Sequence, residues 1–319
     1  MSSYLDAINS IVNDTKDLPY FEVDHGRLKY FFQLTNILTI VSDNSGTGKT
    51  LLWDILRKYP GNRAKVNSNK RVVAIEMFCE ITEDDNIFII DEDSECFTKA
   101  YISRFKDRLQ TGKGCFVVLS RDAVFEDLAY SADDIKVLQS SNGIIEVVNK
   151  YPIFYKLGIP ITQHYFTEDS GSGNYFMSRL FGDVKTTDGI SNWKAAFKEL
   201  PETTTYFFDR CGCGSQIEGI YKMYLLNKGS MYLCDYESFE EFLLKILGDT
   251  YEPDFTCTNK EKGYADRLHE LLSQYSKSKT ISACFIRCKQ CHSCNYANEF
   301  LNSRKAFEKS YLSKYVEVP

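Results

Sequence analysis

The spacing of hydrophobic residues in the first half of the chain predicts strands that alternate with helices. Residues 19–41 predict paired strands, because apolar and polar positions alternate around the turn-forming Asp24-His25-Gly26 and an apolar run follows at 37–41. From Thr50 the apolar positions have helical spacing, which ends at Pro60-Gly61. Further strands are expected at 72–75, 87–90, 115–119 and 143–148, and further helices at about 96–110 and near 124–137. This alternation predicts an α/β fold, a parallel sheet with helices on both faces.

After residue 150 the pattern restarts and predicts a second, smaller α/β domain. Strands are expected at 161–167, 204–208 and 231–234, and helices at about 174–181, 192–200 and 216–225, with a turn at Asp188-Gly189. We therefore expect three regions, namely residues 1–150, residues 151–250, and a Cys-rich, basic helical region over 251–319.

The composition excludes several classes of protein. Hydrophobic residues make up 43% of the 319 residues and charged residues 26%, which argues against wholesale disorder. The net charge of −6 restricts any contact with nucleic acid to a local patch. The first 18 residues do not resemble a secretory signal, and no apolar run approaches the length of a membrane span. Together with eleven cysteines, this predicts a cytoplasmic protein without membrane association.

Residues 43–50 match a phosphate-binding loop between a strand and a helix. Glycines let backbone amides curl around phosphate oxygens at the positive end of the helix. Lys49 would reach the terminal phosphates, and the Thr50 hydroxyl would bind Mg²⁺. Asp43 stands where the usual pattern has its first glycine, so its side chain should point away or cap the turn. The predicted nucleotide-binding residues here are Asn44, Ser45, Gly46, Thr47, Gly48, Lys49 and Thr50.

An apolar strand about 40 residues downstream ends in two adjacent carboxylates, Asp91 and Glu92. Asp91 would hold Mg²⁺ through water, and Glu92 would polarise the attacking water. Lys49, Asp91 and Glu92 are therefore the predicted catalytic residues, with Thr50 and Asp91 as the magnesium ligands.

With these motifs, residues 19–150 resemble the P-loop NTPases, and in detail the ATP-binding-cassette branch that includes the overcoming-lysogenization-defect ATPases. The resemblance implies Mg²⁺-dependent ATP hydrolysis. In that branch a Thr-His switch ends the last strand, whereas this chain has Ser120-Arg121, which the resemblance places beside the nucleotide. Arg121 is either a sensor of the terminal phosphate or a surface arginine. Residues 51–86 leave no room for the helical lobe of that branch and contain no LSGGQ-like segment.

Residues 151–250 resemble the Toprim fold of topoisomerases, primases and nucleases. Glu168 follows the first strand and Asp209 a later one, and the resemblance makes both magnesium ligands for phosphodiester chemistry. Cys211 replaces the second acid of the Asp-x-Asp pair, and Asp169 replaces the glycine after the glutamate. Three alternatives stay open: a degenerate Toprim domain for binding or regulation, an active nuclease, and a generic α/β domain.

Four cysteines lie close together near the C-terminus: Cys284, Cys288, Cys291 and Cys294. They ligate Zn²⁺ in a structural site, with Cys211, Cys213, Cys257 or His292 as a substitute ligand, hold another cluster such as an iron–sulphur cluster, or remain free thiols. Between residues 277 and 314, eight basic residues stand against two acidic ones. This segment is either a patch that binds the phosphate backbone of a nucleic acid or a solvated helix face.

The sequence therefore predicts an ATP-binding protein. We expect a Mg²⁺-dependent ATPase coupled to a Toprim-like domain with a role on nucleic acid, and the link to mobile elements or phage defence rests on family analogy alone. The alternative is a non-hydrolysing, nucleotide-dependent switch or scaffold that binds a protein partner. Whether copies of the chain associate stays open.

Overall fold

The structure is a computed structural model that describes residues 19–26, 28–44, 46–59, 64–82, 84, 86–121, 125, 128–151, 164–170, 173–174, 177–178, 182–198, 204–214, 216–226, 231–233, 237–246, 249–254 and 259–277. The chain divides into two compact units. The first comprises Met1–Ala129, Asp133–Lys150 and Phe255–Thr258, and the second Tyr130–Ala132, Tyr151–Asp254 and Asn259–Pro319.

The first unit is built on one large sheet. Its described strands are β1 (Tyr20–His25), β2 (Leu28–Gln33), β3 (Leu38–Ser42), β4 (Ala64–Val66), β5 (Arg71–Ile75), β6 (Asn86–Asp91), β7 (Cys115–Ser120), β8 (Ile135–Ser141) and β9 (Ile144–Asn149). Their order is β4-β1-β2-β9-β8-β3-β7-β6-β5. Neighbours are parallel except β1–β2, β1–β4 and β8–β9. The predicted α/β class, with a mostly parallel sheet, is confirmed.

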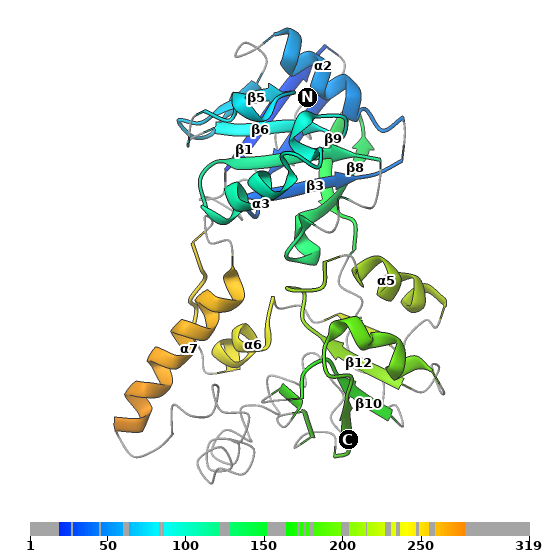
Figure 1. Cartoon of the computed structure of the whole chain (residues 1–319), viewed down its shortest axis with the longest axis vertical. Coiled ribbons are helices and arrows are strands. Elements are labelled where there is room, and N and C mark those ends of the chain that lie inside the picture. Colours follow the sequence, from blue (N-terminus) through cyan, green and yellow to red (C-terminus); the bar gives the residue numbers. More distant parts are fainter. Residues whose placement is uncertain are drawn as a thin grey trace. The chain divides into compact units, whose positions relative to one another are not determined.

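Two helices cover opposite faces of the central strands, α2 (Lys49–Lys58) and α3 (Ile102–Gln110) (Figure 1). Leu52 and Leu56 of α2 are buried in one core cluster with Val117 of β7. Phe105 of α3 packs edge-on against Phe116, with ring centroids 5.4 Å apart. Successive strand residues point to opposite faces, so Phe116 and Val117 place the two helices on different sides. This two-sided burial explains why the central strands are almost continuously apolar.

The predicted helix near 124–137 is wrong. In its described part a 3₁₀ turn, Ala132–Asp134, leads directly into β8, which pairs antiparallel with β9. Asn142 and Gly143 join these strands with positive φ angles of 51° and 81°. Such a pair matches the twist of a tight hairpin, and the Asn-Gly dipeptide is its usual sequence signal. The hairpin adds β8 and β9 to the sheet.

The helix expected at about 96–110 is shorter than predicted. A 3₁₀ turn, Glu95–Phe97, comes first, and α3 begins only at Ile102. Another 3₁₀ turn, Phe78–Glu80, follows β5, and β4 was not predicted. The other predicted strands of this unit and the helix that begins beside Thr50 are confirmed within one or two residues.

The second unit has a parallel sheet of its own, in the order β11-β10-β12-β13 among the described residues. The predicted strand 204–208 and helix 216–225 are confirmed, and strand 231–234 is confirmed over its described residues, 231–233. The helix expected at 192–200 is, in its described part, a 3₁₀ helix, Ile190–Phe197. The predicted helix 174–181 and the start of strand 161–167 fall partly outside the described residues. The elements are β10 (His164–Thr167), β11 (Val184–Thr186), β12 (Thr204–Phe208), β13 (Met231–Leu233), α5 (Gln216–Leu226), α6 (Phe239–Ile246) and α7 (Lys260–Lys277).

Helix α7 belongs to the second unit, where it packs against α6 (Figure 1). The four clustered cysteines and the basic segment beyond Lys277 lie outside the described residues. Within the described part of the chain, no helix has the length and apolar character needed to span a membrane.

Candidate functional site

The loop that joins β3 to α2 is curled by two glycines. Gly46 and Gly48 have φ angles of +88° and +97°, a left-handed conformation that glycine adopts at little cost. The loop starts beside β7, because the Asp43 N–H donates to the Ser120 carbonyl at 3.2 Å. The first amides of α2 have no acceptor within the helix, so this loop offers donors to an anion. Ser45 lies outside the described residues.

Tyr30 of β2 packs against Gly48 in the loop. Its hydroxyl donates to the Gly48 carbonyl at 3.0 Å, and its side chain is fully buried. A Cβ atom on Gly48 would lie 2.9 Å from the Tyr30 Oη atom. The position therefore excludes a side chain both by its backbone angle and by its neighbour.

We expect Gly48→Ala to displace the loop and weaken anion binding more than Gly46→Ala does. Both substitutions impose a left-handed conformation that costs roughly 1–2 kcal/mol, but a Cβ on Gly46 meets nothing within 4 Å. Thermal unfolding and phosphate-analogue binding of the two variants separate backbone strain from the clash with Tyr30. Equal losses in both variants would contradict the role given to Tyr30.

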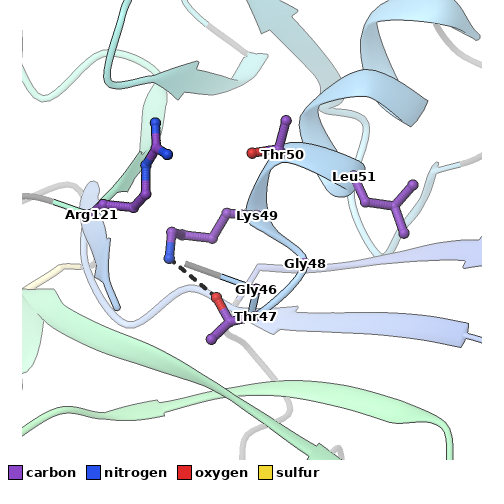
Figure 2. Close-up of a pocket in the computed structure, with 7 residues that line it drawn as sticks. All are labelled: Gly46, Thr47, Gly48, Lys49, Thr50, Leu51 and Arg121. Carbon is purple, nitrogen blue, oxygen red and sulfur yellow. Dashed lines mark hydrogen bonds between the residues drawn. The ribbon is translucent and has the colours of Figure 1, made fainter. Parts of the chain in front are cut away.

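Lys49 lies across the loop with its side chain almost fully buried. Its Nζ atom donates to the carbonyls of Asp43 at 2.7 Å and Asn44 at 2.8 Å. It also donates to the Thr47 hydroxyl at 3.1 Å, the bond that Figure 2 shows as a dashed line. Burial lowers the pKa of this ammonium, and nearby carboxylates oppose that effect. The loop thus holds a desolvated cation at its centre.

The side chain of Asp43 caps the turn, as expected. Its Oδ1 atom accepts from the Asn44 N–H at 2.7 Å, and its Oδ2 atom accepts from the Leu138 N–H at 3.4 Å. Because both oxygens are engaged with backbone amides, the acid that replaces the usual glycine is accommodated beside an anion site.

An open pocket of about 250 Å³ lies over this loop (Figure 2). Ligand pockets commonly measure roughly 300–1,000 Å³, so this one suits a chain of phosphates better than a whole nucleotide. Asn44 and Ser120, which were also predicted, do not line it. Its lining residues are Gly46, Thr47, Gly48, Lys49, Thr50, Leu51 and Arg121, of which Leu51 alone was not predicted.

The two predicted acids lie at the carboxyl end of β6, next to the end of β7. The Glu92 carboxylate accepts from the Arg121 N–H at 2.6 Å and the Ser120 hydroxyl at 3.2 Å, and it pairs with the Arg121 guanidinium. Parallel strands bring their carboxyl ends to one edge of a sheet, which explains this convergence. Arg121 therefore belongs both to the pocket and to the Glu92 cluster.

The two carboxyls have different electrostatic surroundings. Burial raises the pKa of Asp91, although its carboxylate accepts from the Asp93 N–H at 3.3 Å. Burial also acts on Glu92, but the hydrogen bonds from Arg121 and Ser120 outweigh it and lower the pKa. Glu92 is thus ionised at neutral pH and able to accept a proton.

In the second unit, Glu168 and Asp209 follow adjacent parallel strands, β10 and β12. Asp209 accepts from the Phe239 N–H at 3.2 Å, while no described residue provides a hydrogen-bond partner for the buried Glu168 Oε2 atom. Burial, followed by repulsion from neighbouring carboxylates, raises the pKa of Glu168 to about 8 and that of Asp209 well above its usual range. Burial also raises the pKa of Glu240 on α6. The site is a desolvated cluster of carboxyl groups.

We expect Glu168→Gln to stabilise the protein at pH 8 and to leave its stability unchanged near pH 4. Between the usual glutamate pKa of about 4.3 and the raised value of about 8, Glu168 keeps its proton in the folded state and loses it in the unfolded state. The unfolding free energy of the wild type therefore falls as the pH rises towards about 8. Thermal unfolding of the full chain checks this, with exposed Glu252→Gln as the control. Identical pH dependence in wild type and Glu168→Gln would contradict the raised pKa.

The same measurement tests the predicted magnesium site. If Glu168 and Asp209 bind Mg²⁺, adding the ion at pH 8 raises the melting temperature of the wild type but not that of Glu168→Gln. Equal effects of Mg²⁺ on both proteins would exclude Glu168 as a ligand.

The residues that depart from the Toprim pattern are engaged elsewhere. Cys211 is buried, and its thiol contacts the Glu261 carboxylate at 3.8 Å. Asp169 accepts from the Gly173 N–H at 3.0 Å, so its carboxylate caps the following loop. Across the described ranges, no three His, Cys, Asp or Glu side chains are arranged to hold a metal ion. The Mg²⁺ site at Glu168 and Asp209 and the Zn²⁺ site stay predictions.

Comparison of the chain with protein-family models gives no match, and comparison with curated proteins gives no match either.

Proposed function

We propose that the first unit binds ATP with Mg²⁺ at the β3–α2 loop and hydrolyses it. The observation that supports this most is the pocket lined by residues 46–51 together with Arg121. The donors suit polyphosphate: left-handed glycines expose backbone amides, and Lys49 and Arg121 add two cations. The Thr50 hydroxyl and the Asp91 carboxylate are oxygen donors of the kind that Mg²⁺ prefers.

Each residue then has a distinct role. Lys49 holds the terminal phosphates after its Nζ atom exchanges a bond within the loop for a phosphate oxygen. Thr50 and Asp91 hold the metal ion, which neutralises phosphate charge when bound. Glu92 accepts a proton from the attacking water, because its carboxylate is ionised and lies at the adjacent strand end.

A non-hydrolysing nucleotide switch is the second candidate. The observation that favours it is the engagement of Glu92 by Arg121 and Ser120, which occupies the carboxylate proposed as the base. In this case nucleotide binding alone changes the affinity for a partner. For the second unit we propose binding or regulation of nucleic acid or protein, because buried Cys211 stands in place of an acid.

Calorimetric titration with Mg-ATP, followed by measurement of phosphate release with and without DNA or RNA, tests the proposal. Binding with turnover supports the ATPase, and binding without turnover supports the switch. Absence of ATP binding by the folded wild-type protein would overturn both.

A further inference from the structure

The two cations of the phosphate pocket are held in different ways. Lys49 is 6% exposed and is tied to the carbonyls of its own loop. The Arg121 side chain is 58% exposed and pairs with the Glu92 carboxylate. In Figure 2 the Lys49 Nζ atom turns toward Thr47, whereas the Arg121 guanidinium extends away from the loop. Arg121 is therefore the cation that can change partner with a simple side-chain rotation.

Glu92 does not depend on the guanidinium for its position. Its side chain is 14% exposed, and it retains the Arg121 N–H at 2.6 Å and the Ser120 hydroxyl at 3.2 Å as donors. If the guanidinium leaves, the carboxylate stays at the strand end with one oxygen released.

A terminal phosphate is a strong competitor for this guanidinium. Arginine binds carboxylate and phosphate through the same planar set of donors. An ion pair with one exposed partner adds little net stability, so its exchange for a more highly charged group is favourable. Arg121 already lines the pocket that suits the phosphates.

We propose that Arg121 distinguishes a nucleoside triphosphate from a diphosphate by exchanging the Glu92 carboxylate for the terminal phosphate. This inference rests on the proposed function, because it requires a nucleotide in the pocket. The exchange releases a Glu92 oxygen when the triphosphate is bound, and a diphosphate leaves the Arg121–Glu92 pair intact. The same residue thus couples recognition of the terminal phosphate to the availability of the base.

Equilibrium titration of the full chain with a non-hydrolysable ATP analogue and with ADP tests the exchange. Arg121→Ala is expected to weaken analogue binding about tenfold and to change ADP binding by less than about twofold, the order expected for one charge-assisted contact. Glu92→Gln is expected to favour the analogue over ADP, because the competing group has lost its charge. The matched control is Arg71→Ala, since Arg71 is exposed at the opposite end of the parallel strands.

Equal losses of analogue and ADP affinity in Arg121→Ala, or no loss of either, would overturn the inference while the nucleotide function stands. If the wild type binds neither ligand, the proposed function fails and the inference fails with it.

Discussion

Replacing Lys49 by methionine is expected to lower the affinity of the chain for Mg-ATP by about a hundredfold, the upper range for hydrogen bonds to a charged group. Methionine keeps most of the buried stem volume, so the fold of the loop should survive. The loss arises because Lys49 is the buried cation at the centre of the loop. Calorimetric titration at constant ionic strength measures it.

A lysine away from the pocket separates this local effect from a change in net charge. Lys65 on β4 is exposed, so Lys65→Ala should bind Mg-ATP like the wild type. Thermal unfolding of both variants checks that they are folded. If folded Lys49→Met retains wild-type affinity, the loop is not the phosphate site.

The phosphate loop could be predicted because its determinants are local in the sequence. Gly46 and Gly48 supply the left-handed turns, and Lys49 follows at the start of the helix. No local pattern indicates that Tyr30 packs under Gly48 or that the Leu138 N–H reaches Asp43. These contacts depend on the order of strands in the sheet, which periodicity does not determine.

The failed helix prediction has a local cause. Several apolar residues near 124–137 fit helical spacing by chance, whereas the Asn142-Gly143 dipeptide that follows them is a hairpin signal. Pairing with β3 and β9 then favours a strand over any helical preference of residues 135–141.

In the second unit, only the resemblance to the Toprim fold implied that Glu168 and Asp209 act together, and the structure has them following adjacent parallel strands. The contribution of α6 was missed, although Ser238-x-x-Glu241 is a helix-start pattern. In the structure the Glu241 N–H donates to the Ser238 hydroxyl at 3.4 Å, and the helix start presents the Phe239 N–H to Asp209. The raised pKa values could not be predicted, because they follow from burial in three dimensions.

Replacing Glu92 by glutamine is expected to lower the rate of phosphate release by about 10²–10⁴-fold, the usual contribution of a general base. Glutamine still accepts hydrogen bonds from the Arg121 N–H and the Ser120 hydroxyl, so ATP binding should be retained. Because the hydrogen bonds of Glu92 lower its pKa, the wild-type rate should not fall from protonation of this group until the pH is below its usual range near 4. At ATP concentrations far below saturation, where the rate reports the protein before ATP binds, removing the Arg121 side chain should move that acid limb to higher pH, since the guanidinium stabilises the carboxylate.

The neighbouring Asp93 provides the matched control for this prediction. It is exposed one residue beyond Glu92, and Asp93→Asn should leave phosphate release near the wild-type rate. Turnover by Glu92→Gln at the wild-type rate would exclude Glu92 as the base. If the wild type binds ATP but releases no phosphate, the Arg121–Glu92 pair is better explained as part of a binding switch, in which the three donors keep the Glu92 carboxylate engaged in every state, so that it takes no proton from water.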